Sequence, residues 1–294
     1  MSDELANLIR AARQMLENEL MLGGNFLARR GGQLPQFATA AAVSAPSQGT
    51  SASVVSAAMS MSAAARPGAA GGRAAGKAKV AGLDIPPLSA EDLPQTAQAK
   101  ASALADLYEQ ASKCLACQLA RTRTKLVFGE GNPAAQIVFV GEAPGEDEDL
   151  SGRPFVGRAG QKLGDMIVAM GLTREQVYIC NVLKCRPPDN RPPAPEEIAV
   201  CWPLLIRQLQ IIRPKCIVTL GNPATQNLLR TTVGITKLRG QWQKLPDWAP
   251  GLADLPVMPT FHPSYLIRSY TVENRRMVWS DLQKAMDLLG ISKP

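Results

Sequence analysis

The stretch IVFVGEAPGEDEDLSGRPFVGRAGQKLGDMIVAM, residues 137–170, decides the fold of this chain. It begins with four apolar residues, 137–140, which predict a short buried strand. A glycine-rich loop with an acidic run follows, and residues 159–170 then place apolar side chains at helical spacing until Gly171 ends the pattern. Strand, loop and helix in this order form the repeating unit of a parallel sheet covered by helices.

The same alternation continues to the C-terminal end of the sequence. Further strands are predicted at 177–182, 216–220 and 257–260, and further helices at 195–212, 224–229 and 272–289. The pattern predicts an α/β sandwich with a mostly parallel sheet. Ligands of such sheets bind beyond the carboxyl ends of the strands, so the loop after residue 140 lies where a binding site is expected.

Composition divides the chain into three regions. Residues 1–24 are a predicted amphipathic helix, which either docks on its own domain or serves as a docking peptide for a protein partner. Residues 25–98 are dominated by Ala, Ser, Gly and Pro. Such a segment buries too little apolar surface to offset its ordering entropy, so a flexible linker is predicted. Residues 99–294 are predicted to form the folded domain.

Charge and hydropathy narrow the class of protein. The chain has 294 residues, a formal net charge of +7 and 46% hydrophobic residues. The positive charge is compatible with a polyanionic partner. No apolar run reaches the roughly 20 residues of a membrane span, and the acidic start lacks the features of a signal peptide. We therefore expect a cytoplasmic protein with no membrane partner.

Six cysteines in a cytosolic chain favour metal or redox chemistry over disulfides. Four of them have a spacing that suits one four-thiolate site: Cys114, Cys117, Cys185 and Cys201. Cys180 and Cys216 fall inside predicted strands and are expected to be core residues. The spacing leaves structural zinc and an iron–sulfur cluster both open, with scattered reduced cysteines as the alternative.

Three side chains near the expected binding edge have complementary chemistry: Phe155, Asn181 and His262. An aromatic ring offers a stacking surface for a flat heterocycle. A carboxamide presents an acceptor beside donors, which matches the N–H and neighbouring carbonyl of uracil, whereas cytosine would oppose both contacts. A histidine can donate to an oxygen on which negative charge develops, although a lone histidine more often has a structural role. Together these residues suit the binding of a pyrimidine and its stabilisation as a leaving anion.

The order and spacing of these motifs resemble the family 4 uracil-DNA glycosylases, the iron–sulfur branch of that superfamily. The matching segments are GEAPG at 141–145, RPFVG at 153–157, Asn181 with KCRPP at 184–188, and HPS at 262–264. The four spaced cysteines match as well. The resemblance covers about residues 100–290 and leaves the N-terminal hundred residues outside it.

The resemblance implies a three-layer α/β/α sandwich around a four-stranded parallel sheet. It also implies a [4Fe–4S] cluster with a structural role on Cys114, Cys117, Cys185 and Cys201. The residues implied to contact uracil are Gly141, Glu142, Ala143, Phe155, Asn181 and His262. Of these, Glu142, Asn181 and His262 are the predicted catalytic residues.

The reaction implied by the resemblance is hydrolysis of the N-glycosidic bond of uracil in DNA, which leaves free uracil and an abasic site. The base must first leave the duplex stack. Tyr265, Leu266 and Arg268 are predicted to bind DNA, with Leu266 or Ile267 as a wedge in the vacated stack and Arg268 as a phosphate contact. Ordinary packing at a helix entry is the alternative for these residues.

At the position of the water-activating residue, this chain differs from the best-known branch of the superfamily. That branch has an Asp that activates water and an aromatic residue that blocks the thymine methyl, where this chain has Ala143 and Gly145. Glu142 is therefore the first candidate for this role and Glu146 the second. Most carboxylates of residues 146–149 are expected to face away from the DNA backbone or to cap the next helix.

Three other functions are each compatible with part of the sequence. A metal-dependent nuclease or phosphohydrolase would hold Mg²⁺ on residues 146–149, but leaves the pyrimidine-binding side chains without a role. A non-enzymatic cysteine-cluster protein would bind DNA and dock through residues 1–24. A uracil-binding relative that becomes trapped covalently on DNA would carry a histidine-containing insertion that residues 184–201 lack. We expect a monomer whose partners are uracil-containing DNA and a protein that binds the N-terminal helix.

Overall fold

The computed structural model describes residues 85–89, 91–247 and 251–292. The predicted N-terminal helix at 1–24 and the predicted linker up to residue 84 lie outside the described residues. Among the described helices, none combines the length and apolar character needed to cross a membrane.

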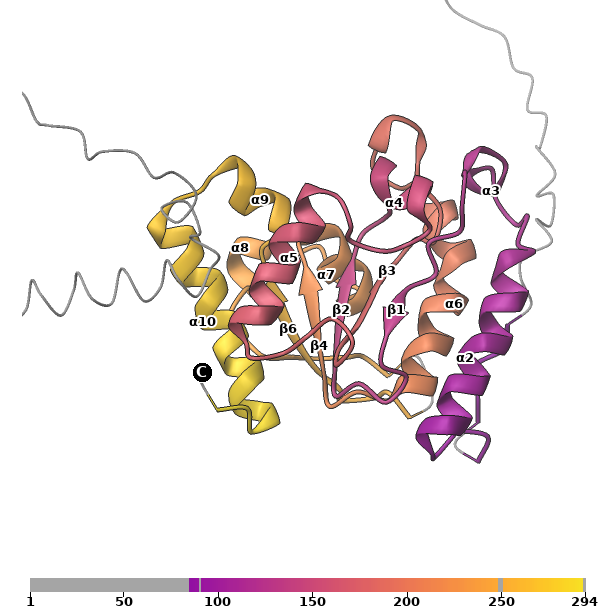
Figure 1. Ribbon diagram of the computed structural model, residues 1–294, viewed down its shortest axis with the longest axis horizontal. Coiled ribbons are helices and arrows are strands. Elements are labelled where there is room, and N and C mark those ends of the chain that lie inside the picture. The colour runs from indigo at the N-terminus through magenta and orange to yellow at the C-terminus, as the bar shows by residue number, and fades with distance from the viewer. Residues whose placement is uncertain (1–84, 90, 248–250, 293–294) are drawn as a thin grey trace, which may run out of the picture. The chain divides into compact units, whose positions relative to one another are not determined.

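A mixed sheet forms the middle layer, with the strand order β1-β3-β2-β4-β6-β5 (Figure 1). Its strands are β1 (Glu130–Gly131), β2 (Ile137–Gly141), β3 (Tyr178–Asn181), β4 (Cys216–Leu220), β5 (Gln243–Lys244) and β6 (Pro256–Thr260). The four inner strands β3, β2, β4 and β6 are parallel, as predicted. The two outer strands, of two residues each, pair antiparallel at the edges and raise the strand count from four to six.

Helices flank the sheet on both faces. They are α2 (Ala97–Ser112), α3 (Leu119–Thr122), α4 (Glu146–Ser151), α5 (Arg158–Ala169), η1 (Pro188–Asn190), α6 (Pro195–Ile212), α7 (Asn222–Leu229), α8 (Ile235–Leu238), α9 (Pro263–Arg268) and α10 (Val272–Leu289). Helices α6 and α10 have the predicted bounds. The three-layer sandwich is confirmed.

The alternating directions of the side chains along β2, a central strand, explain why helices cover both faces of the sheet. Val138 and Val140 pack in one core with residues of α2 and α6, whereas Ile137 and Phe139 pack in a second core with residues of α5 and α10. Successive side chains of a strand point to opposite faces, so a strand covered on both faces must be apolar throughout. All five residues of β2 are buried. Figure 1 shows α5 and α10 on one side of the sheet and α2 and α6 on the other.

The folded part begins before residue 99. Ile85 and Leu93 are buried, and Leu88 exchanges two hydrogen bonds with the Gln210 carboxamide, at 2.9 and 3.1 Å. Thr96 caps α2 by accepting a hydrogen bond from the Ala99 backbone N–H. The assignment of residues 85–98 to the linker was therefore wrong, because the few apolar residues of this proline-containing segment pack against the domain.

The acidic run is a helix rather than a loop. Residues 146–149 occupy the first turn of α4, where carboxylates are favoured by the helix dipole. Asp149 accepts the Thr124 backbone N–H at 3.0 Å, and Glu148 accepts the Gly145 backbone N–H at 3.1 Å. These two contacts hold a segment before β1 and the start of α4 itself. Glu148 also accepts the backbone N–H groups of Val156 and Gly157 at the start of α5, which is the expected capping of the next helix.

Candidate active site

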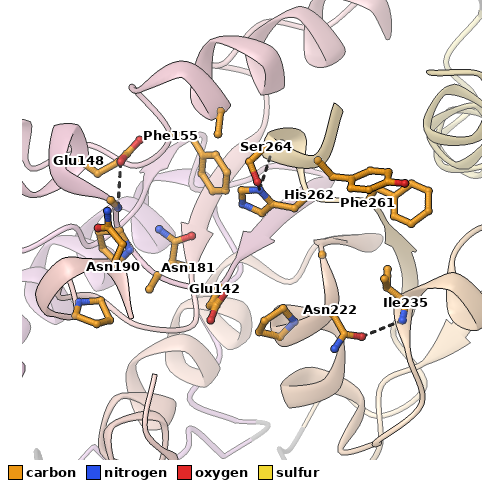
Figure 2. A pocket seen from close by; sticks show the side chains of 18 of the residues that line it. Glu142, Glu148, Phe155, Asn181, Asn190, Asn222, Ile235, Phe261, His262 and Ser264 are labelled. Atoms are coloured by element: carbon orange, nitrogen blue, oxygen red, sulfur yellow. Dashed lines mark hydrogen bonds between the residues drawn. The ribbon is translucent and has the colours of Figure 1, made fainter. Parts of the chain in front are cut away.

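A cavity of about 770 Å³ opens at the carboxyl edge of the parallel strands. Glu142 reaches it from the end of β2, Asn181 from the end of β3, Asn222 from the start of α7 after β4, and His262 from the residue before α9 after β6 (Figure 2). The cavity therefore lies where the parallel topology predicts a ligand.

The three predicted recognition side chains face this one cavity. The ring centroids of Phe155 and His262 are 5.8 Å apart, with an interplanar angle of 34°. A Cβ atom added to Gly141 would lie 2.3 Å from Asn181 Oδ1 and 2.5 Å from Phe155 Cζ, so the carboxamide and the ring meet over this glycine. Only a residue without a side chain fits at the end of β2, which explains the glycine there.

Asn181 presents a buried acceptor that has no partner. Its side chain is 2% exposed, and Oδ1 accepts no hydrogen bond from any described residue. Its backbone carbonyl is fixed separately by Lys184 Nζ at 2.7 Å. An unsatisfied buried acceptor costs about 1–3 kcal/mol, so the site suits a ligand that brings an N–H group.

His262 is held as a neutral imidazole. Its Nδ1 accepts the Ser264 backbone N–H at 3.1 Å and lies 2.8 Å from Ser264 Oγ, which in turn accepts from Arg268 at 3.2 Å. Burial, with Arg268 nearby, lowers the pKa of His262 to about 4. Because Nδ1 is an acceptor, the single proton of the neutral ring sits on Nε2 and is available to a ligand.

The two candidate carboxylates differ in position. Glu142 lines the cavity, and burial raises the pKa of its carboxyl above the ordinary value. Glu146 does not line it; its side chain is 67% exposed and lies 3.6 Å from Arg186 Nη2. Ala143 and Gly145 also line the cavity and supply neither a carboxylate nor an aromatic group. The geometry therefore favours Glu142 over Glu146.

A family model described as the uracil DNA glycosylase superfamily matches residues 128–283. The chain belongs to this superfamily. It is 51% identical over 183 residues to the type-4 uracil-DNA glycosylase of Thermotoga maritima, a match that covers 62% of this chain and 92% of that protein. It is 43% identical over 197 residues to the type-4 uracil-DNA glycosylase of Archaeoglobus fulgidus, which covers 65% of this chain and 96% of that protein. A type-5 uracil-DNA glycosylase of Pyrobaculum aerophilum matches at 30% over 151 residues, 46% of this chain and 64% of that protein.

Helix α9 of this superfamily member corrects one predicted DNA contact. Leu266 is 0% exposed and packs in the core with α5 and α10, so it cannot be the wedge in its present position. Tyr265 and Arg268 line the cavity, and Ile267 is only partly buried. Ile267, the alternative on the same helix, is therefore the remaining candidate for the wedge.

The cysteines of this superfamily member lie in different surroundings. Cys180 and Cys216 are buried within β3 and β4. Cys117 and Cys201 pack beside Cys185, and Cys114 lies near enough to raise the pKa of both Cys185 and Cys201 as a minor contribution to the effect of burial. Among the described residues, no group of three or more His, Cys, Asp and Glu side chains is close enough to hold a single metal ion.

Two N–H groups donate hydrogen bonds to cysteine sulfur atoms. The Lys184 backbone N–H donates to Cys201 Sγ at 3.3 Å, and Arg123 Nη1 donates to Cys185 Sγ at 3.2 Å. Hydrogen bonds to sulfur and nearby positive charge are the surroundings that protein-bound iron–sulfur clusters use to set their properties. Burial raises the pKa of Cys201 to about 12, so a thiolate at this position requires compensating positive charge.

Sequence reasoning missed part of the cavity wall. Pro187, Asn190 and Arg191 come from the segment after the cysteine motif, and Ile235 and Thr236 from α8. None of these residues ends a predicted strand, so the rule that ligands bind at strand ends could not find them. The proline-rich composition of 187–193 indicates a loop but not the direction in which it runs.

Proposed function

We propose that this chain hydrolyses the N-glycosidic bond of uracil in DNA and leaves free uracil and an abasic site. The observation that carries the proposal is the convergence of an aromatic ring, an unpartnered carboxamide oxygen and a neutral imidazole on one cavity: Phe155, Asn181 and His262. Membership of the uracil DNA glycosylase superfamily supports the same reaction.

Recognition of uracil follows from the wall of the cavity. The base stacks against Phe155 and contacts the backbone of residues 141–143. Asn181 Oδ1 accepts the uracil N3–H, and the Asn181 amide donates to the neighbouring carbonyl O4. Cytosine would place an unprotonated ring nitrogen against Oδ1 and an amino group against the amide, so both contacts would be repulsive. A site discriminates strongly against a base that leaves the buried polar groups of the site unpaired.

Bond cleavage produces an oxocarbenium-like sugar and a uracil anion. His262 Nε2–H donates to uracil O2, the carbonyl beside the breaking bond, where negative charge grows. One oriented donor of this kind contributes roughly 3–4 kcal/mol to the transition state. Because the ring is already neutral with its proton on Nε2, no proton has to move before the bond breaks.

Glu142 positions the attacking water. As the N1–C1′ bond breaks, the water oxygen bonds to C1′ and its proton passes to the Glu142 carboxylate, while uracil keeps the electron pair of the broken bond. A negative carboxylate near the sugar also stabilises the positive charge that develops there. Burial makes this carboxylate more basic than an exposed glutamate.

Contacts to DNA come from α9. Arg268 is exposed beside the cavity and holds a phosphate, while Tyr265 packs against the strand that carries the flipped nucleotide. Ile267 fills the space that the extruded base leaves in the stack, at a flipping cost of a few kcal/mol.

Cys114, Cys117, Cys185 and Cys201 would hold a [4Fe–4S] cluster. Cys117, Cys185 and Cys201 pack together, and N–H groups donate to the sulfur atoms of Cys185 and Cys201, which supports this ligand set. A bound cluster would link the segment before β1 to the segment after β3 and to α6, and would have a structural role.

The test is base release under multiple turnover in EDTA. Purified protein is incubated with duplexes that contain either uracil or a mismatched thymine, and abasic sites and free base are scored. We expect abasic sites only in the uracil duplex. Loss of activity in EDTA, with strand cleavage restored by Mg²⁺, would instead support the nuclease, and DNA binding without base release would support the non-enzymatic alternative.

A further inference from the structure

Phe155 has an unusual backbone for a bulky residue. Its φ of 51° lies in the left-handed region, which side chains with a Cβ atom rarely adopt. A Cβ atom on Gly160 would lie 1.9 Å from the Phe155 carbonyl carbon, so α5 packs directly against this backbone. A bulky residue keeps such a conformation only where the surrounding structure enforces it.

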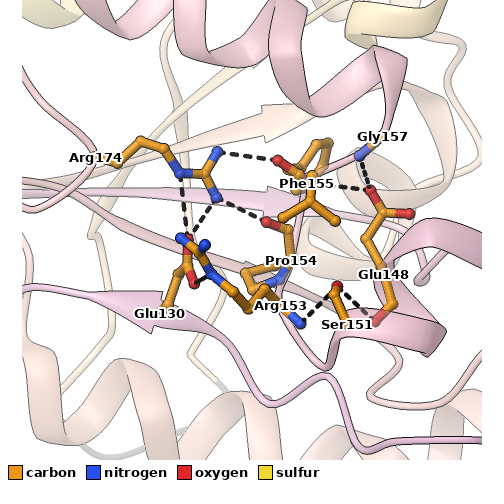
Figure 3. A network of polar contacts seen from close by, with 9 residues as sticks. Glu130, Glu148, Ser151, Arg153, Pro154, Phe155, Gly157 and Arg174 are labelled. Carbon is orange, nitrogen blue, oxygen red and sulfur yellow. Dashed lines mark hydrogen bonds and ion pairs between the residues drawn. The ribbon is translucent and has the colours of Figure 1, made fainter.

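Arg174 holds this backbone through two hydrogen bonds. Its Nη1 donates to the Phe155 carbonyl at 3.0 Å, and its Nη2 donates to the Pro154 carbonyl at 2.7 Å (Figure 3). Arg174 belongs to the turn between α5 and β3 and is not among the residues that line the cavity. The guanidinium therefore fixes two consecutive carbonyls, although Arg174 itself does not line the cavity.

Glu130 orients the guanidinium. Arg174 Nη2 lies 2.7 Å from Glu130 Oε1, and Arg153 Nε lies 2.8 Å from Glu130 Oε2. Glu130 sits on β1, the short edge strand that sequence reasoning missed. On the other side of Phe155, Glu148 accepts the backbone N–H groups of Val156 and Gly157 at 2.9 and 3.0 Å.

We propose that Arg174, braced by Glu130, is a positioning residue for uracil, because it fixes the left-handed Phe155 backbone and so directs the ring toward Asn181 and His262. The inference rests on the proposed function. Without Arg174, two buried carbonyls lose their donors and the Phe155 backbone returns toward an ordinary conformation. The ring then leaves the position over Gly141 that makes one wall of the uracil site.

The test compares Arg174→Ala with Arg153→Ala. Arg153 pairs with the same Glu130 carboxylate but donates to neither the Pro154 nor the Phe155 carbonyl, so it is a matched control. The readouts are the inhibition constant of free uracil, kcat and KM on a uracil-containing oligonucleotide, and the Tm. We expect Arg174→Ala to weaken inhibition by uracil ~10-fold and to lower kcat, with little change in KM. Arg153→Ala should keep the uracil inhibition constant within ~2-fold of wild type.

Arg174→Lys tests the same idea in a variant that keeps the charge. An ammonium group cannot span both carbonyls and the carboxylate, so its uracil inhibition constant should lie between those of wild type and Arg174→Ala. If both Arg174 variants have a lower Tm but bind uracil as wild type does, the inference is overturned and Arg174 only stabilises the loop. A wild-type protein that neither releases nor binds uracil would overturn the proposed function and this inference together.

Discussion

The rings of Phe155 and His262 lie 5.8 Å apart at the carboxyl edge of the sheet, although 106 residues separate them in the sequence. One follows the α4 helix and the other follows β6, and Asn181, at the end of β3, lines the same cavity. In the proposed function, the uracil base lies beside this pair, stacked on the Phe155 ring and hydrogen-bonded to the His262 imidazole.

His262→Ala should lower kcat by about 10²- to 10³-fold, because it removes the donor to the developing uracil anion. The affinity for DNA should change little, because His262 does not contact the DNA backbone in the proposed complex. The measurement is single-turnover uracil release together with binding of a uracil-free duplex. Ser264→Ala, which removes the hydroxyl next to Nδ1 but keeps the imidazole, should have a much smaller effect. Wild-type rates in His262→Ala would remove the histidine from the mechanism.

Asn181→Asp should slow uracil release and reduce discrimination against cytosine. The carboxylate keeps an acceptor for an N–H or amino group but loses the donor to uracil O4. Release of uracil and of cytosine from matched duplexes measures the effect. Asn222→Asp adds the same charge to the same cavity while keeping an acceptor for the Ile235 N–H, so it controls for charge alone. Equal losses in the two variants would contradict direct reading by Asn181.

Gly141→Ala should abolish uracil binding, because the new methyl group would lie 2.3 Å from Asn181 Oδ1 and 2.5 Å from the Phe155 ring. Gly164→Ala is the control, since nothing lies within 4 Å of an added Cβ at this position of α5. That variant should keep its activity and gain roughly 0.5–1 kcal/mol in the free energy of unfolding. Uracil release and the Tm of both variants provide the comparison. A fully active Gly141→Ala protein would show that the ring and the carboxamide do not meet around the base.

The pH dependence of the reaction rate should follow the ionisation of the Glu142 carboxyl. Burial raises the pKa of this carboxyl, and the reaction uses its ionised form, so activity is present above the raised pKa and lost as the pH falls through it. His262 stays neutral until the pH falls to about 4. Glu142→Gln should therefore lower the rate by about 10²-fold or more and remove the acid limb down to that pH. An unchanged acid limb in Glu142→Gln would assign the limb to another group.

Cys185→Ser should lose the visible absorbance of an iron–sulfur cluster and should fold poorly, because a ligand that links the segment after β3 to the other cysteines is removed. Cys216→Ala is the control, since Cys216 is buried in β4 away from the four grouped cysteines. Iron and sulfide content and the visible spectrum are measured on both proteins. An undiminished spectrum in Cys185→Ser would exclude Cys185 from the ligands.

The sequence predicted those elements whose signal is local and strong. Residues 195–212 and 272–289 carry a helical apolar period between clear start and stop residues, and β4 is apolar except for Thr219. The parallel order of strands then placed Asn181 and His262 at one edge, because the carboxyl ends of parallel strands meet there. The rule therefore predicted the position of the cavity from the order of the strands alone.

The features that were missed either depend on contacts distant in the sequence or lie in elements too short to show an apolar period. β1 has two residues and exists as a strand only through its pairing with β3. The helix α4 has no apolar period, so its acidic run was interpreted as a loop. Leu266 was assigned to the DNA surface because a six-residue helix does not reveal which of its sides packs against the core. The role of Arg174 is invisible in the sequence because its acceptors lie 19 and 20 residues away.

The recognition of an extruded uracil is tested by a crystal structure of the slowed His262→Ala variant bound to a uracil-containing duplex. We expect a flipped-out uracil stacked on the Phe155 ring, with its N3–H donated to Asn181 Oδ1 and its O2 facing the space left by the imidazole. A uracil that remains in the duplex, or that binds in a different cavity with Asn181 Oδ1 still unpartnered, would contradict it.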